Sequence, residues 1–247
     1  MRSWSVIKIV VFFVLSAICL YTMSYLFGTL YLPEINKEAF SAVSNTKYRT
    51  VIIDAGHGGE DGGALSADGL IEKHINLDIA MMLRDLLSSC GVNVVMTRTE
   101  DKLLYDRNVD YMGRKKKLDL AARLAIAEKT EGAVFVSIHM NSYTDPKYSG
   151  LQVWYSQNDP DSIILAELIQ SFNREKLQPD NKRKTKAATS SIRLLNEATC
   201  PAVLVECGFL SNAQEAKKFE DVGYKQKVAF VLFCSIINFL DEGGSLS

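Results

Sequence analysis

Hydrophobic positions follow two alternating spacings along most of the chain, and this alternation predicts a series of strands and helices. Short apolar runs rich in Val and Ile are typical of buried strands, whereas apolar residues three and four apart are typical of amphipathic helices. We expect strands at residues 49–54, 92–97, 133–138, 151–155 and 201–205. We expect helices at residues 72–89, 118–129, 160–176 and 222–240. Such alternation predicts an α/β domain in which a sheet lies between layers of helices.

The N-terminal part of the chain is apolar without this periodicity. No charged residue occurs from Ile9 to Leu32, and a helix of this length exceeds the roughly 30 Å of bilayer hydrocarbon. Arg2 and Lys8 precede the run, so the positive-inside rule predicts that the rest of the chain lies outside the cytoplasm. We therefore expect an N-terminal transmembrane helix, with the chain divided into an anchor or signal segment (1–33), a tether (34–48), a main domain (49–241) and a tail (242–247).

A cleaved signal peptide, and hence a secreted protein, is the alternative for the first segment. The apolar region of a signal peptide is usually about 7–15 residues, which is shorter than this run. Only a weak cleavage site, Ala39-Phe40-Ser41, follows it. We therefore expect the segment to be retained, so that the protein is anchored in the cytoplasmic membrane with its main domain in the cell-envelope space.

Charge and cysteine content limit the classes of protein to which this chain can belong. The formal net charge is −1, and 23% of residues are charged, so the overall balance gives no indication of nucleic-acid binding. Basic clusters at residues 114–117 and 182–186 are either solvated charge or a site for an anionic polymer or membrane headgroups. Of five cysteines, Cys200 and Cys207 flank a predicted strand, which places them roughly 20 Å apart and excludes a disulfide between them.

Three ionisable side chains follow apolar strands in the same way. His139 and Glu206 each come directly after a predicted strand, and His57 follows a third after two small residues. The carboxyl ends of strands in an open α/β sheet form the edge where ligands bind. These three side chains therefore predict a site, and the glycine-rich loop after His57 permits close approach of the backbone to a bound ion. That loop lacks the pattern of a phosphate-binding loop and contains acidic residues, so a metal ion is the better ligand.

A catalytic zinc site needs a third protein ligand and leaves one position open. Glu72 and His74 are the candidates, and they point about 200° apart on a helix, so only one of them can face the site. A carboxylate also suits the positive end of a helix, which favours Glu72. Asn141, two residues after His139, is a candidate contact for substrate or ligand, and Asp54 is a candidate partner of a metal ligand.

Four motifs in order resemble the zinc-dependent N-acetylmuramoyl-L-alanine amidases. They are His57-Gly58-Gly59-x-Asp61-x-Gly63-Ala64, Glu72-Lys73, Ser137-Ile138-His139-x-Asn141, and the segment at residues 201–212 that contains Glu206 and ends in Gly208-Phe209-Leu210-Ser211-Asn212. The segment at residues 97–101 and Arg123 also match family positions. The resemblance covers residues 49–240, and it departs from the family at residues 182–184, where an Arg-Gly pair is common.

The resemblance implies a three-layer fold with a central six-stranded mixed sheet, and one Zn²⁺ bound by His57, Glu72 and His139. It also implies that Glu206 is the catalytic carboxylate and that the domain at 49–241 hydrolyses the amide between the lactyl group of N-acetylmuramic acid and L-alanine in peptidoglycan. The anchor, the lack of wall-binding repeats and the insertion at residues 112–120 resemble the spore-cortex (germination-specific) branch. That branch implies a location in the cell envelope or the forespore intermembrane space, with peptidoglycan as partner. The sequence reveals no activator and no obvious autoinhibitory helix, so we expect control to come from an accessory activator protein or from timing.

Other functions remain open from the sequence. A vegetative autolysin or a peptidase acting within the stem peptide would use the same chemistry. A non-catalytic peptidoglycan-binding module on the same fold would be expected to lose Glu206 or a metal ligand, and all four residues are present.

Overall fold

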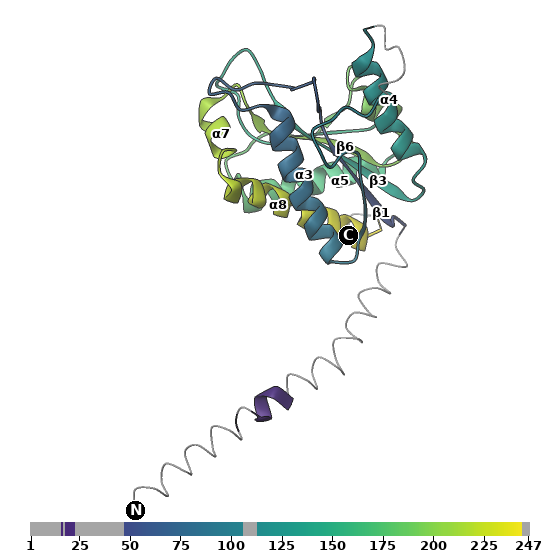
Figure 1. Cartoon of the computed structure of the whole chain (residues 1–247), viewed down its shortest axis with the longest axis vertical. Coiled ribbons are helices and arrows are strands. Elements are labelled where there is room, and N and C mark those ends of the chain that lie inside the picture. The colour runs from purple at the N-terminus through teal and green to yellow at the C-terminus, as the bar shows by residue number, and fades with distance from the viewer. Residues whose placement is uncertain (1–15, 17, 23–46, 106–112, 244–247) are drawn as a thin grey trace, which may run out of the picture. The chain divides into compact units, whose positions relative to one another are not determined.

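Six strands form one mixed sheet in the computed structural model, which describes residues 16, 18–22, 47–105 and 113–243 (Figure 1). The order of the strands across the sheet is β2-β1-β3-β6-β4-β5, and neighbours are parallel except β4 and β6, which are antiparallel. The strands are β1 (Thr50–Ala55), β2 (Asn93–Met96), β3 (Ala133–Asn141), β4 (Gln152–Tyr155), β5 (Lys186–Ala187) and β6 (Ala202–Phe209). The predicted α/β class and six-stranded mixed sheet are confirmed.

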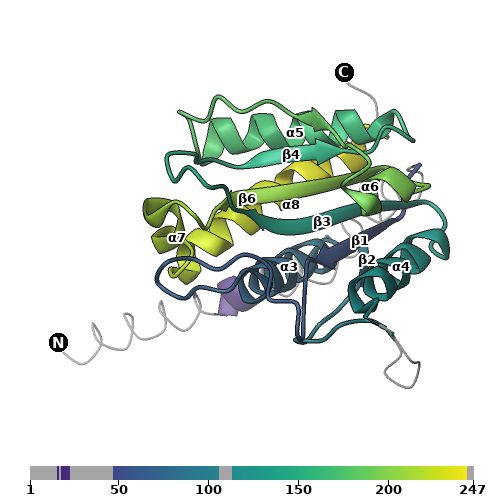
Figure 2. The ribbon, with the colours of Figure 1, turned by 90° about the horizontal axis from the view of Figure 1, so that it is seen from above.

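Helices cover both faces of this sheet, and Figure 2 shows β4, β6, β3 and β1 side by side between them. One face packs against α3 (Glu72–Ser89), α5 (Asp161–Lys176) and α8 (Val222–Asp241). The other packs against α4 (Lys115–Glu128) and the short α6 (Arg193–Glu197). Another short helix, α7 (Ala213–Lys218), follows β6 and begins at Asn212, whose side chain accepts a hydrogen bond from the main chain of Glu215.

Alternation of side chains along the strands separates two apolar cores. Val51 and Ile53 of β1 pack in the larger core with α3, α5 and α8, whereas Ile52 packs in the smaller core with α4 and α6. Successive side chains of a strand point to opposite faces, so an apolar run without alternation is what a strand covered on both faces requires. The larger core also contains Ile79 and Leu83 of α3, which are completely buried on the inner face of that helix.

Strands β3 and β6 are longer than predicted, so His139 and Glu206 lie within the strands and not after their ends. The predicted strands end at residues 138 and 205, but pairing continues through His139, which lies opposite Glu206, and on to Asn141, which lies opposite Phe209. The apolar run is interrupted there because alternate residues, His139 and Asn141 on β3 and Glu206 on β6, line clefts, whereas Met140 and Cys207 are buried in the larger core. Strand β5 and helices α6 and α7 were not predicted, and α4 begins at Lys115, three residues before its predicted start.

The predicted membrane anchor lies outside the described residues, apart from residues 16 and 18–22. None of the helices formed by the described residues has the length and apolarity needed to cross a bilayer.

Candidate active site

His57 follows β1 in a left-handed backbone conformation, with a φ of 62°. Arg98 donates hydrogen bonds to the main-chain oxygens of Ala55 and Gly56 at 2.8 and 2.9 Å. Arg123 donates to those of Ala55 and His57 at 2.9 and 2.8 Å. Such a conformation costs about 1–3 kcal/mol in a residue other than glycine. The hydrogen bonds from two buried arginines offset that cost and fix the position of His57.

Glu72 is the first residue of α3, and its carboxylate is buried beneath the loop that precedes the helix. Oε2 accepts a hydrogen bond from the main-chain nitrogen of Ala64 at 2.7 Å, and Oε1 accepts one from that of Met140 at 2.9 Å. Asn76, one turn along α3, donates to Oε1 at 3.2 Å. Main-chain donors and the positive end of the helix thus stabilise the charged form of Glu72.

Two glycines permit the close approach of the side chains in this site. A Cβ atom at Gly56 would lie 2.3 Å from Cε1 of His139, and one at Gly63 would lie 2.5 Å from Oε2 of Glu72. Gly63 also has a φ of 72°, which side chains rarely allow. Any larger residue at either position would displace a ring or a carboxylate.

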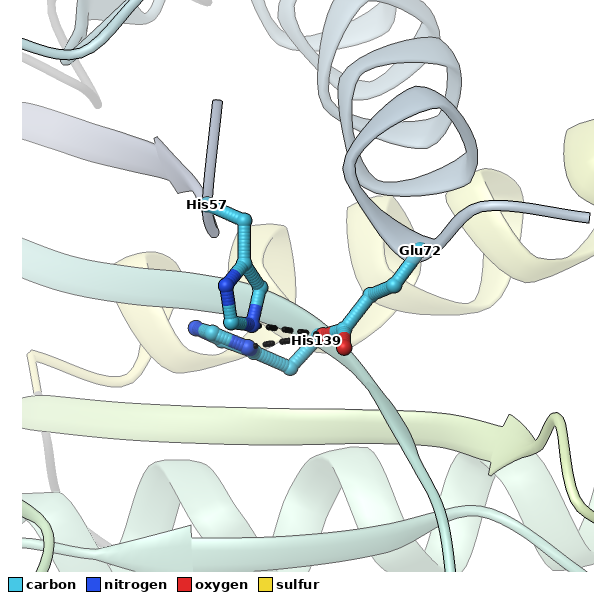
Figure 3. Close-up of side chains that lie close together, drawn as sticks. All are labelled: His57, Glu72 and His139. Atoms are coloured by element: carbon cyan, nitrogen blue, oxygen red, sulfur yellow. Dashed lines mark hydrogen bonds and ion pairs between the residues drawn. The ribbon is translucent and has the colours of Figure 1, made fainter. Parts of the chain in front are cut away.

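His57, Glu72 and His139 form a group that could bind a metal ion, because one donor atom from each lies within 4.8 Å of the others. Figure 3 shows both imidazoles directed at the Glu72 carboxylate, whose Oε1 lies 3.2 Å from Nε2 of His57 and 2.9 Å from Nδ1 of His139. His74 is exposed and is not part of this group, so the structure selects Glu72 from the two candidates. Two imidazoles and one carboxylate form a donor set that suits zinc with one open position.

The protonation states of His57 and Glu72 depend strongly on each other and on the neighbouring ionisable groups. Burial alone would lower the pKa of His57, but its two ring nitrogens donate hydrogen bonds to Asp61 and Glu72, and these bonds raise the pKa to about 9. Burial would raise the pKa of Glu72, but the two histidines hold it well below its ordinary value. Without a metal ion, His57 thus retains its proton at neutral pH, in contact with two carboxylates.

Glu206 lies on β6 directly opposite His139 of β3. Side chains of paired residues point to the same face of a sheet, so the carboxyl group of Glu206 lies next to the group of metal-binding candidates. Its Oε2 atom is buried without a hydrogen-bond partner among the described residues. Burial raises the pKa of Glu206 to about 7. A carboxyl group with this pKa can both accept and release a proton near neutral pH.

Asp54 is completely buried at the cleft that His57 and His139 line, and it forms no hydrogen bond or ion pair with the three metal-binding candidates. It accepts hydrogen bonds from Thr97 at 2.7 Å and Ser137 at 2.6 Å, and it forms an ion pair with Arg123. Burial would raise the pKa of Asp54, but Arg123 and the hydroxyl donors hold it below its ordinary value. Asp54 therefore acts on the site indirectly, because it pairs with Arg123 and Arg123 binds the main chain of His57.

Asp61 is a second carboxylate, besides Glu72, that contacts His57, and the sequence alone did not assign it this position. Its Oδ2 lies 3.0 Å from Nδ1 of His57, and its Oδ1 accepts a hydrogen bond from the main chain of Gly63. The sequence signal for this contact is that Asp61 follows His57 by four residues within a glycine-rich loop. Asn141, the other predicted contact, lines a cleft on the far side of Glu206 from His57.

A cleft of about 230 Å³ opens onto this site. His57, His139 and Glu206 line one wall, and Lys116 and Arg193 contribute to its outer part. The arrangement combines a three-donor group for a metal ion with a proton-accepting carboxyl group at one opening. This combination on an α/β fold is typical of metal-dependent hydrolases.

Comparisons with known proteins agree with that class. The family model for N-acetylmuramoyl-L-alanine amidase matches residues 51–238. The germination-specific N-acetylmuramoyl-L-alanine amidase of Bacillus subtilis is 33% identical over 229 residues, which cover 90% of this chain and 95% of that protein. The chain therefore belongs to the N-acetylmuramoyl-L-alanine amidase family, and it is an amide-bond hydrolase.

Solved structures of amidases are also similar to this chain. The CwlD amidase from Clostridioides difficile, in complex with the GerS lipoprotein, is 38% identical, with a TM-score of 0.73 over 78% of this chain and 98% of that one. The amidase AmiC2 of Nostoc punctiforme is 30% identical, with a TM-score of 0.65 over 78% of this chain and 97% of that one.

Proposed function

We propose that this amidase uses one Zn²⁺ bound by His57, Glu72 and His139, and that Glu206 is its catalytic carboxylate. The observation that carries the proposal is the register of β3 and β6, because it places Glu206 beside the three-donor group. Bound at that group, Zn²⁺ would supply Lewis acidity, which lowers the pKa of water and polarises a carbonyl group.

The protein side chains have separate parts in the hydrolysis. Glu206 accepts the proton of the attacking water, because its pKa of about 7 leaves it partly ionised at neutral pH. It then passes the proton to the departing amino group of L-alanine. Asp61 fixes the orientation of the His57 ring through Nδ1, and Arg123 fixes the main chain of the same residue. The lactyl carbonyl of N-acetylmuramic acid would lie in the cleft between His57 and Glu206.

The test is mass spectrometry of purified peptidoglycan after treatment with the full chain. The wild-type protein with zinc should release peptides with N-terminal L-alanine and leave bare lactyl groups. Glu206→Gln should reduce the rate by about 10²–10⁴-fold, and chelation should abolish it. Glu220→Gln, which changes an exposed glutamate, is the matched control and should be fully active. Unchanged cleavage by Glu206→Gln would contradict the assignment of the base.

We further propose that the substrate is the spore cortex, because the similar protein from B. subtilis is germination-specific by name. A vegetative autolysin is the second candidate. In a strain that lacks the protein, muramic acid without a stem peptide should decline in cortex preparations and be unchanged in the vegetative wall. A decline in the vegetative wall alone would favour the autolysin.

The uncharged run at residues 9–32 supports anchoring in the cytoplasmic membrane, with the domain at 49–241 on the outer side, in the envelope or forespore intermembrane space. The alternative is secretion after cleavage. A protease added to intact protoplasts should degrade the domain and leave the N-terminal segment with the membrane. The complex of the similar amidase with a lipoprotein supports an accessory protein as a partner of this chain too.

A further inference from the structure

A second cleft, of about 340 Å³, lies on the same sheet face beyond Glu206. We name it the distal cleft and define it by Gln152, Trp154, Arg183 and Lys186, which line it together with aromatic side chains. Gln152 of β4 is paired with Glu206 of β6, which is paired in turn with His139. The three side chains form one row on one face, so the distal cleft continues from the site across β4 and β5.

Two cations in the distal cleft have no carboxylate partner among the described residues. Arg183 donates to Oε1 of Gln152 at 3.1 Å and to the main-chain oxygen of Ser149 at 2.6 Å, and its guanidinium lies 4.4 Å from the ring centre of Phe209. Lys186 lies with Nζ 5.1 Å from the ring centre of Trp154. Glu215 acts on Arg183 electrostatically but forms no ion pair with it, and its Oε2 atom accepts hydrogen bonds from the main chain of Gly150 and Phe209. Aromatic rings and neutral oxygens are thus the direct contacts of both cations, which favours an anionic ligand.

The chemistry of peptidoglycan decides which part of it this ligand is. The acetylated sugars of the glycan strand carry no ionised group, whereas the free carboxyl groups of the stem peptide are ionised at neutral pH. The stem peptide begins at the amide bond that the proposed function assigns to the site at Glu206. We propose that Arg183 and Lys186 bind carboxylates of the stem peptide in the distal cleft, an inference that rests on the proposed function.

This placement gives the two sides of the scissile bond different surroundings. The peptide side lies over β4 and β5 against two cations and aromatic rings. The acyl side lies over β1 and β3, in the cleft at His57. Specificity for the stem peptide then comes from the loop at residues 181–186 and not from the metal-binding group.

The kinetic test uses the zinc-loaded full chain and two forms of a muramoyl peptide, one with free carboxyl groups and one with carboxamides. Lys186→Gln and Arg183→Gln should each raise KM for the free acid about tenfold, the loss expected for one charge-assisted contact. kcat should change less than twofold, and KM for the carboxamide should be unaffected. Lys184→Gln, an exposed lysine of the same loop that lines neither cleft, is the control. Equal losses on both substrates, or the same loss in the control, would overturn the inference.

A binding measurement separates this inference from the proposed function. Calorimetry with the free stem tripeptide should show binding that Lys186→Gln weakens about tenfold and Lys184→Gln does not. Binding without any cleavage of the muramoyl peptide would support the distal cleft and refute the proposed reaction. Poly(glycerol phosphate) binding that depends on Arg183 and Lys186, with no binding of the tripeptide, would overturn the inference in favour of an anionic wall polymer.

Discussion

Arg123 donates a hydrogen bond to the main-chain oxygen of His57 at 2.8 Å, while its other nitrogens contact two buried aspartates, Asp54 and Asp119. The guanidinium therefore pairs with two buried carboxylates and fixes a residue in a left-handed conformation. Arg123 thus links the buried aspartates beneath the site to the main chain of His57, and Arg98 adds a second positive charge near them.

Arg123→Ala should lower the free energy of unfolding by about 3–5 kcal/mol, because it leaves buried carboxylates without their cation. Denaturant unfolding of the metal-free protein measures this loss. Arg193→Ala, which breaks a surface pair with Glu197 and one exposed hydrogen bond to the main-chain oxygen of Lys117, should cost about 1 kcal/mol. A loss at Arg123 as small as that at Arg193 would show that the buried network contributes little to stability.

Metal binding should release protons at neutral pH. The pKa of His57 is about 9 because Asp61 and Glu72 lie at its two ring nitrogens, and a metal ion at Nε2 requires the neutral imidazole. Metal affinity should therefore rise as pH increases to about 9 and then level off. Calorimetry in buffers of different ionisation enthalpy gives the number of protons released, which should fall between pH 7 and pH 9.5. A constant proton count over this range would refute the assignment of His57.

Glu206→Gln should stabilise the metal-free protein at pH 8 but not at pH 4. The folded protein retains the Glu206 proton up to its pKa of about 7, whereas the unfolded chain releases it near the ordinary value of 4.5. The unfolded state thus binds fewer protons between these values, so folding stability falls as pH rises through them. The substitution removes this loss, which is about 1–3 kcal/mol. Thermal unfolding at the two pH values measures it, and an equal effect at both would contradict the raised pKa.

Gly56→Ala should weaken metal binding at least tenfold, an effect of about the size seen when contacts to metal ligands are changed. The new Cβ would overlap the His139 ring, at 2.3 Å from Cε1. Gly223→Ala is the control, since its Cβ would meet only the tip of the Asp221 side chain, at 3.3 Å. Competition with a fluorescent chelator gives both affinities. If the two variants bound metal equally well, the close approach of Gly56 would have no functional role.

Much of the fold could be predicted because its buried strands are continuous apolar runs. β1 and the first part of β3 have this pattern, and α3 and α8 have clear helical periodicity. β5 has only two residues and α6 only five, which is too short for either period to be visible. α7 does have a sequence signal, since Asn212 precedes Glu215 by three residues in the manner of a helix cap.

The candidate site was predictable to a similar extent. Because the carboxyl ends of strands meet at one edge of a sheet, the sequence predicted that His57, His139 and Glu206 lie together. Because residues two apart on a helix point in different directions, it also predicted that only one of Glu72 and His74 faces them. The contacts of Asp61 and Arg123 depend on a left-handed turn at His57 and on pairing of residues far apart in the chain. Neither is visible in local periodicity, so only the structure places these two side chains.

The hydrogen bonds from Arg98 and Arg123 to the carbonyls of residues 55–57 do not involve the ion-binding atoms. The loop that presents His57 is therefore held by contacts within the protein, and none of these contacts depends on a bound ion. In such a design the shape of the loop and the supply of an ion are separate controls on activity.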